Sequence, residues 1–239
     1  EVWPEAGPPP PDVLAARLAA ADAAMTMVVD RVTPSMLDTA PRLKVLANMA
    51  VGYDNIDPAE AAKRGVRVTN TPGVLAETTA DMAFALLMAA ARNVVASDRD
   101  TRAGGWTTWS PTGFLGQDVF GATLGIVGLG EIGEAMARRA LGFRMRVVYT
   151  SRTRKPEAEA RFGCRFVEIG ELLAQSDFVS LHVPLNGSTR GMIGARELRL
   201  MKTSAILVNT ARGQVVDLGG LTAYIRDGDI FQANLARTW

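Results

Sequence analysis

Short apolar runs alternate along the chain with longer segments in which apolar residues recur at helical spacing. The apolar runs predict buried strands at Met25–Val29, Leu43–Ala47, Val66–Thr69, Thr123–Val127, Met145–Thr150, Phe178–Val183 and Ala205–Asn209, with a last strand starting near Ile230. The intervening segments predict helices from Asp12 to about Ala24, after the N-cap candidate Thr33, and at about Pro58–Arg64, Glu131–Leu141, Gly194–Met201 and Leu218–Arg226. This alternation of strand and helix indicates an α/β fold with a parallel sheet.

The segment from about Leu75 to Asp98 predicts one long helix with apolar residues on more than one face. Such a helix must be covered on several sides, and a second subunit is one candidate for the cover. A homodimer is therefore one interpretation, and a central core helix in a monomer is the other. The loop from Ala103 to Gly121 follows, and its aromatic residues suit an interface: Trp106, Trp109 and Phe114.

A turn cluster at Thr71–Gly73 is the candidate hinge between two domains. It predicts a first domain at residues 1–72 and a second at residues 73–239. The predicted dimerisation helix and loop, at about residues 75–121, belong to the second domain.

A glycine pattern follows the predicted strand Thr123–Val127 and opens the next helix. In this G-x-G-x-x-G spacing, Gly128 permits a tight turn, Gly130 lets a pyrophosphate approach the backbone, and Gly133 lets the helix pack against the strand. A second strand then arrives at the distance expected of a βαβ unit. The pattern predicts a dinucleotide site built on Gly128, Leu129, Gly130, Glu131, Ile132 and Gly133.

The residues after the second strand bear on which nucleotide binds. Enzymes that select NAD usually place Asp or Glu about 20 residues after the glycine turn, to bind the ribose 2′-hydroxyl. Here the segment reads Ser151-Arg-Thr-Arg-Lys155, without a carboxylate. The Arg152 guanidinium can bind a 2′-phosphate, with hydroxyl donors from Ser151 and Thr153. This favours NADP(H), with NAD(H) as the alternative cofactor; a solvated basic turn is the competing interpretation.

Composition excludes some classes of partner and location. The 239 residues carry a formal net charge of +1 and 48% hydrophobic residues, so nucleic acid is not an expected partner. We expect no membrane segment, because no uninterrupted apolar stretch reaches membrane-spanning length. Cys164 is the one cysteine, which excludes an internal disulfide and fits a cytoplasmic location; we expect it to be a half-buried strand residue.

Together these motifs resemble the D-isomer-specific 2-hydroxyacid dehydrogenase family, and within it the glyoxylate/hydroxypyruvate reductase branch. The matching blocks follow the family's order and cover nearly the whole chain: Val51–Asp57, Val68–Gly73, Gly128–Gly133, Ser180–Leu185, Val208–Gly213 and Val215–Asp217. The resemblance implies a Rossmann-type doubly wound parallel sheet with a smaller, flavodoxin-like substrate domain. It also implies NADPH-dependent reduction of a small 2-oxo acid, such as glyoxylate or hydroxypyruvate, to the 2-hydroxy acid.

The resemblance assigns roles to residues outside the glycine turn. By it, the backbone N–H groups of Val51 and Gly52 bind the substrate carboxylate, and Arg212 holds the carboxylate and polarises the keto oxygen. Thr210 and Ala211 match positions where the backbone approaches the nicotinamide. Further positions match the cofactor side of the family's site: Thr79, His182, Val183 and Pro184. Without the resemblance, His182 reads as a strand-end histidine satisfied by backbone, and it does not match the family's acid.

The C-terminal part departs from the family pattern. Family members carry an Asp, a Glu and then a general-acid His after the last strand, whereas here Ala236 stands at the Asp position and the other two would lie beyond Trp239. We therefore expect a truncated or catalytically impaired form, with a substrate domain that lacks its first strand and its C-terminal return segment. One alternative is a non-catalytic dinucleotide-binding dimer that acts as an interaction module. Another is a different D-2-hydroxyacid dehydrogenase, such as a phosphoglycerate dehydrogenase.

Overall fold

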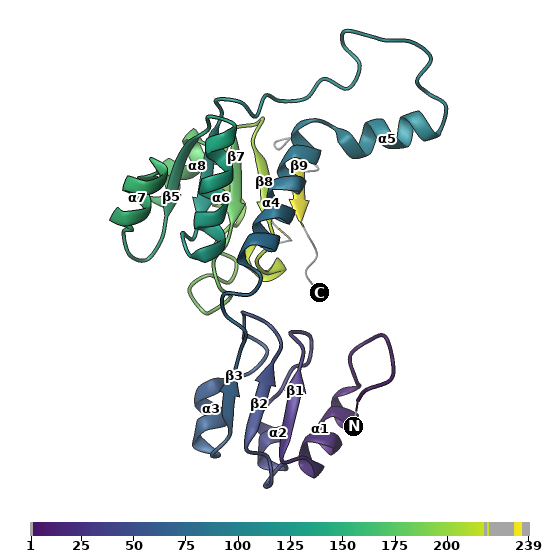
Figure 1. The fold of residues 1–239 in the computed structure, drawn as a ribbon, viewed down its shortest axis with the longest axis vertical. Helices are drawn as coiled ribbons and strands as arrows, with labels where there is room; N and C mark the ends of the chain where they lie inside the picture. The colour runs from purple at the N-terminus through teal and green to yellow at the C-terminus, as the bar shows by residue number, and fades with distance from the viewer. Residues whose placement is uncertain (1, 218, 220–231, 236–239) are drawn as a thin grey trace. The chain divides into compact units, whose positions relative to one another are not determined.

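A computed structural model of the protein describes residues 2–217, 219 and 232–235. The chain divides into two compact units, a smaller one that ends at Leu75 and a larger one that begins at Ala76. Figure 1 shows each unit as a sheet with helices beside it. The assignment of residues 1–72 to substrate binding and 73–239 to dinucleotide binding stays a prediction.

The smaller unit contains a three-stranded parallel sheet in the order β1-β2-β3. Its elements are α1 (Pro11–Ala20), β1 (Ala23–Thr26), α2 (Pro34–Asp38), β2 (Val45–Asn48), α3 (Pro58–Lys63) and β3 (Arg67–Thr69). Each helix begins with a proline, whose fixed φ and missing N–H suit the first helical position. The apolar faces of these elements enclose a core centred on Leu18, Leu37, Leu46, Ala61 and Val66.

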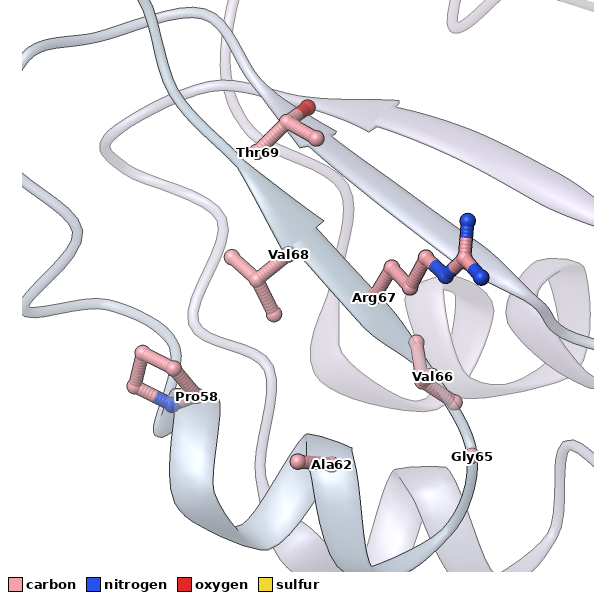
Figure 2. Close-up of a pocket in the computed structure, with 7 residues that line it drawn as sticks. All are labelled: Pro58, Ala62, Gly65, Val66, Arg67, Val68 and Thr69. Carbon is pink, nitrogen blue, oxygen red and sulfur yellow. The ribbon is translucent and has the colours of Figure 1, made fainter.

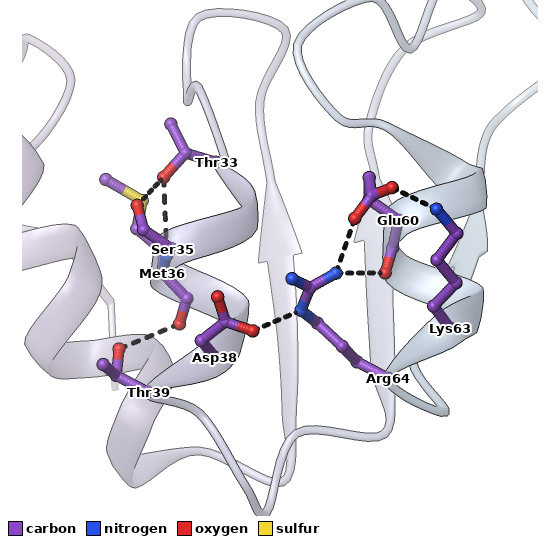
Figure 3. Close-up of polar contacts among 8 residues, drawn as sticks. All are labelled: Thr33, Ser35, Met36, Asp38, Thr39, Glu60, Lys63 and Arg64. Carbon is purple, nitrogen blue, oxygen red and sulfur yellow. Dashed lines mark hydrogen bonds and ion pairs between the residues drawn. The ribbon is translucent and has the colours of Figure 1, made fainter.

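Side-chain caps and ion pairs fix the helices of this unit (Figure 3). The Thr33 hydroxyl accepts a hydrogen bond from the Met36 N–H at 3.4 Å, which confirms Thr33 as the N-cap of α2. Arg64, which follows α3, donates to the Asp38 carboxylate of α2 at 2.7 Å and to the Glu60 carboxylate at 2.8 Å. One guanidinium therefore links the ends of both helices.

Two predicted boundaries in this unit are wrong. The first helix ends at Ala20 rather than near Ala24, and the strand that follows is β1 rather than Met25–Val29. The strand ends early because the Met27 N–H donates to the Asp30 carboxylate at 2.7 Å, which removes it from the sheet ladder.

The described residues of the larger unit form a six-stranded parallel sheet in the order β6-β5-β4-β7-β8-β9. Its strands are β4 (Thr123–Val127), β5 (Arg146–Thr150), β6 (Arg165–Phe166), β7 (Phe178–Leu181), β8 (Ile206–Asn209) and β9 (Gln232–Leu235). Its helices are α4 (Ala76–Ala91), α5 (Val94–Arg102), α6 (Glu131–Gly142), α7 (Pro156–Phe162), α8 (Ile169–Gln175), α9 (Ala195–Leu198) and the 3-10 turn η1 (Gly213–Val215). Read from β4 outwards, this is the doubly wound strand order of a Rossmann fold, as predicted.

Successive strand residues of this sheet enter two different cores. Ile126 and Tyr149 pack with α4 and α6, whereas the adjacent Val127 and Val148 pack with the apolar residues of α8 and α9. Period-two alternation therefore buries both faces of the sheet under helices. Cys164 is buried directly before β6, more deeply than predicted, and burial raises the pKa of its thiol.

The long helix predicted from Leu75 to Asp98 is wrong as a single element. It is two helices, α4 and α5, with a bend of 64° between them. Asn93 has a φ of 53°, a left-handed conformation that ends a helix, and its side-chain amide donates to the Leu115 carbonyl at 2.8 Å. Apart from Gly219, the predicted helix Leu218–Arg226 lies outside the described residues, as does Ile230, while β9 begins at Gln232.

Within the described residues, no single helix has the length and apolar character needed to cross a membrane; α4 and α5 meet that test only when they are taken together as a bent pair.

Candidate dinucleotide site

Four adjacent strands of the larger sheet end side by side, and most of the predicted site residues follow them. Val127 of β4 is in register with Thr150 of β5 and Leu181 of β7, which is in turn in register with Asn209 of β8. Because the strands are parallel, the loops after them meet at one edge, which is where ligands bind in open α/β sheets. The predicted residues that follow these strand ends are Gly128–Gly133, Ser151–Thr153, His182–Pro184 and Thr210–Arg212.

The three glycines of the turn differ in their surroundings in the way the motif requires. Gly128 has a φ of 98°, and a Cβ there would lie 2.8 Å from the His182 carbonyl oxygen. A Cβ on Gly133 would lie 2.3 Å from the Gly128 carbonyl oxygen, so the helix could not pack as closely on the turn. A Cβ on Gly130 would meet nothing within 4 Å, which leaves open space beside the backbone. A pyrophosphate fits this space.

The helix that follows the turn presents unsatisfied donors toward the same space. α6 begins at Glu131, directly after its N-cap residue Gly130, and no side chain in the described part of the chain caps it. The first N–H groups of a helix have no partner inside the helix, and together with the helix dipole they favour an anion. The α6 N-terminus and the space beside Gly130 therefore fit the phosphates of a dinucleotide.

The loop after β5 carries the predicted basic residues. The Ser151 hydroxyl donates to the Thr153 carbonyl at 2.6 Å, while Arg152 and Thr153 are exposed. Arg154 donates two hydrogen bonds to Glu159 of α7, and Glu159 also accepts one from Tyr149 of β5. The sequence pattern singled out neither Tyr149 nor Glu159.

His182 is held by partners on two strands. The backbone N–H of His182 donates to the Val127 carbonyl at 2.8 Å, and its ring Nε2 lies 2.8 Å from the Ser180 hydroxyl. The ring is therefore satisfied by a side chain, not by backbone as predicted. Burial lowers the pKa of His182 to about 4, so the imidazole is neutral near pH 7.

The loop after β8 carries Arg212 and is fixed by the last residue of the strand. Asn209 is 1% exposed; its amide donates to the Arg212 carbonyl at 2.8 Å, and its oxygen accepts from the Ala211 N–H at 3.0 Å. The buried Thr210 Oγ1 has no hydrogen-bond partner within the described residues. Arg212 is half-buried and donates from Nη1 to the Ala211 carbonyl at 3.0 Å. The sequence pattern did not single out Asn209, although a polar residue ending an apolar strand was a signal.

Thr79 lies half-buried in the first turn of α4, which packs against α6 and β8. No described contact ties its hydroxyl to the loops after the strands. Its role near the cofactor stays a prediction.

Val51 and Gly52 belong to the smaller unit, in the loop after β2. Their carbonyl oxygens accept side-chain hydrogen bonds, from Asn70 to Val51 at 2.9 Å and from Asn48 to Gly52 at 2.8 Å. Among the described residues, neither of their N–H groups has a hydrogen-bond partner. Two such N–H groups fit an anion such as a carboxylate.

A shallow hollow in the smaller unit contains none of the predicted site residues (Figure 2). The hollow lies beside α3, the turn after it and β3. Its lining consists of Pro58, Ala62, Gly65, Val66, Arg67, Val68 and Thr69. Arg67 is the one ionisable residue in this lining, so the hollow brings together no group of residues suited to catalysis.

Comparison with known proteins identifies the family. Residues 84–236 match the model of the D-isomer specific 2-hydroxyacid dehydrogenase NAD binding domain. A glyoxylate reductase of Thermococcus litoralis is 52% identical over 98% of this chain and 72% of its own length.

Solved structures agree with this match. A protein from Thermus thermophilus is 46% identical with a TM-score of 0.87, over 95% of this chain and 71% of that one. An acyclic imino acid reductase in complex with NADPH and D-Arg is 31% identical with a TM-score of 0.86, over 95% of this chain and 72% of that one. With a Rossmann sheet and a glycine turn shaped for a dinucleotide, the chain belongs to the D-isomer-specific 2-hydroxyacid dehydrogenases, oxidoreductases that use a nicotinamide cofactor.

Proposed function

We propose that the protein is an NADPH-dependent reductase of small 2-oxo acids, converting glyoxylate or hydroxypyruvate to the 2-hydroxy acid. The observation that carries the proposal is that the glycine turn after β4 and the Arg212 loop after β8 lie at the same edge of one sheet. A phosphate site and a guanidinium suited to a carboxylate are thus available to one bound nucleotide and one substrate. The similarity to glyoxylate reductases supports the choice of substrate.

In this proposal the cofactor's pyrophosphate binds the N–H groups at the start of α6, and its 2′-phosphate binds Arg152. The loop after β5 contains no carboxylate between Ser151 and Lys155 that would repel the 2′-phosphate. NADPH in the imino acid reductase complex shows that a relative of this fold accepts the phosphorylated cofactor. His182, Val183, Thr210 and Thr79 complete the cofactor side of the proposed site.

In the larger unit, the guanidinium of Arg212 binds the substrate carboxylate. In the smaller unit, the N–H groups of Val51 and Gly52 are a second candidate for binding a carboxylate. A bound nicotinamide supplies the hydride that reduces the keto carbon. Arg212 stabilises the negative charge that develops on the keto oxygen, because its planar group donates in a fixed direction and stays ionised.

The proton donor of the reduction is not supplied by a histidine of these 239 residues. His182 is the one histidine in the sequence, and it is neutral near pH 7, partly buried and hydrogen-bonded to Ser180. We therefore assign no acid role to His182.

The homodimer proposal rests on an exposed apolar surface of the larger unit. We call it the arm surface: Val94, Val95, Trp106, Trp109, Phe114 and Leu115, all about half exposed or more. Several exposed large apolar residues within one segment are typical of an interface. A second copy of the chain is the proposed occupant.

The experiment combines binding and turnover. Calorimetry with NADPH and NADH measures cofactor binding, and absorbance at the nicotinamide band follows NADPH oxidation with glyoxylate or hydroxypyruvate. We expect binding with a preference for NADPH and glyoxylate-dependent oxidation that is lost in Arg212→Ala. Folded protein that binds neither nucleotide would contradict the proposal, and NADPH binding without any turnover would favour the non-catalytic dimer.

A further inference from the structure

Two arginines lie two residues apart in the loop after β5, and they differ in their surroundings. Arg152 is exposed, and no ion-pair partner is described for it. Arg154 makes a two-point contact with Glu159, from Nε to Oε1 at 2.8 Å and from Nη2 to Oε2 at 2.7 Å. Binding an anion through Arg154 would require this paired contact to break, whereas Arg152 needs no such exchange.

Glu159 is itself held by the neighbouring strand. The Tyr149 hydroxyl donates to Glu159 Oε1 at 2.7 Å and accepts from the Lys155 N–H at 2.7 Å. Tyr149 is fully buried, and its ring packs edge-on against Phe166 at 5.5 Å. A rigid phenol in the sheet therefore fixes both the far end of the loop and the carboxylate that binds Arg154.

The charge state of this contact is stable near neutral pH. Hydrogen bonds from Arg154 and Tyr149 lower the pKa of Glu159 to about 2. The carboxylate thus stays ionised at the pH where a 2′-phosphate carries its full charge.

The start of the loop is fixed as well. The Gly128 N–H donates to the Thr150 carbonyl at 2.9 Å, which joins the glycine turn to the residue before Ser151. With Lys155 bound to Tyr149, both ends of the segment 151–155 are anchored, and Arg152 lies between the anchors. An anchored loop loses less conformational entropy when it binds a ligand.

We propose that Tyr149 is a positioning residue for cofactor specificity, which holds the loop so that Arg152 is the guanidinium that binds the 2′-phosphate, while Glu159 keeps Arg154 engaged. This inference rests on the proposed NADPH preference. Arg152 and Arg154 thus have different roles, and the buried Tyr149 phenol maintains this difference.

The test uses 2′,5′-ADP and 5′-AMP as probes, with calorimetry on the full chain. The two probes differ only in the 2′-phosphate. The Kd of 5′-AMP divided by the Kd of 2′,5′-ADP therefore reports recognition of that phosphate alone, and a larger ratio means stronger recognition. Arg152→Ala should reduce this ratio about tenfold or more, the loss expected of a charge-assisted hydrogen bond. Tyr149→Phe should reduce this ratio about threefold to tenfold, because the loop loses an anchor. The Kd of 5′-AMP should stay within about twofold of that of the starting protein, because the ring still fills its space.

The double variant Arg154→Ala with Glu159→Gln removes the ion pair without changing the net charge. The introduced amide oxygen can still accept from Tyr149, so the ratio should stay within about threefold of the starting protein. Arg161→Ala, an exposed arginine on α7, is the control for loss of one charge and should have a similarly small effect.

Two results would overturn the inference: a loss in the double variant as large as that in Arg152→Ala, or an unchanged ratio in a folded Tyr149→Phe. If Tyr149→Phe does not fold, a crystal structure with 2′,5′-ADP decides, since a phosphate bound by Arg154 contradicts the proposal and a phosphate bound by Arg152 supports it. A starting protein that binds both probes equally would instead contradict the NADPH preference of the proposed function.

Discussion

Asn209 holds the backbone on both sides of the Ala211–Arg212 peptide, accepting from the Ala211 N–H and donating to the Arg212 carbonyl. A related contact occurs in the smaller unit, where Asn48 ends β2 and donates to the Gly52 carbonyl, while its oxygen accepts from the Thr26 and Asn55 side chains. In both units a buried asparagine at the end of a strand fixes the loop to which we assign substrate binding. The side-chain amide suits this position because it donates and accepts without carrying a charge.

Asn209→Ala should weaken substrate binding through the position of Arg212. We expect the dissociation constant of oxalate, a glyoxylate analogue, to rise about threefold to thirtyfold in the presence of NADPH, since two backbone groups lose their partner. Binding of 2′,5′-ADP should change by less than about twofold, because that probe binds after β4 and β5. Calorimetry measures both constants.

Asn186→Ala is the matched control for this prediction. Asn186 also accepts from a nearby backbone N–H, at 2.9 Å from Ser188, but it is exposed and outside the proposed site. Oxalate binding that is unchanged in a folded Asn209→Ala, or equally weakened in Asn186→Ala, would argue against a positioning role for Asn209.

Two glycine substitutions should separate cofactor binding from stability. Gly130→Ala adds a methyl group to open space at a φ of −92°, so the free energy of unfolding should change by about 1 kcal/mol or less. The same methyl occupies the space proposed for the pyrophosphate, and NADPH binding should weaken at least about tenfold.

Gly133→Ala should mainly lower the free energy of unfolding. Its methyl would lie 2.3 Å from the Gly128 carbonyl oxygen, and relief of this overlap should cost about 1–3 kcal/mol, more than the gain in helix propensity. Denaturant unfolding and calorimetry on both variants test the pair. A Gly130→Ala protein that binds NADPH normally would refute the assignment of the pyrophosphate to the α6 N-terminus.

The arm surface should mediate self-association. Val95 is 54% exposed on α5, and Val95→Asp would place a carboxylate in the proposed dimer interface. Light scattering should give about twice the 25.5 kDa chain mass for the starting protein and the monomer mass for Val95→Asp. Leu141→Asp, at an apolar residue of α6 that is 47% exposed and outside the arm surface, should remain a dimer. Dissociation in both variants, or in neither, would contradict the arm surface as the interface.

The sequence predicted the sheet of the larger unit because buried parallel strands leave continuous apolar runs. The run Thr123–Val127 is β4 without change, and the glycine turn after it has the surroundings that its spacing requires. Helices α7 and α8 were not predicted, since each is only seven residues long and shows too little of a helical period.

Features that depend on tertiary contacts were out of reach of the periodic pattern. The break at Asn93 interrupts a run of helix-forming residues, and it is stabilised by a bond to Leu115, 22 positions away in the chain. The pairing of Tyr149 with Glu159, and of Asn209 with the Arg212 loop, likewise depends on how loops fold back on strand ends. The residues predicted from motifs were therefore those that we propose to contact ligands, and the residues missed were those that position them.

His182 should make the stability of the protein depend on pH in the acidic range. Its folded-state pKa of about 4 lies below the ordinary value of 6.5, so between these values the unfolded chain binds the proton more readily. The free energy of unfolding should therefore fall as the pH decreases from about 6.5 to about 4, by at most about 3 kcal/mol from this group. Below that range the histidine contributes no further change.

His182→Asn removes the titrating group and keeps a polar side chain beside Ser180. Denaturant unfolding between pH 4.5 and 8 should show a smaller loss of stability toward acid in this variant than in the starting protein. The carboxyl groups titrate equally in both proteins, so the difference between the two curves isolates the imidazole. Parallel curves across this interval would mean that the imidazole is not buried in its neutral form, and that the Ser180 hydroxyl does not hold it as the structure indicates.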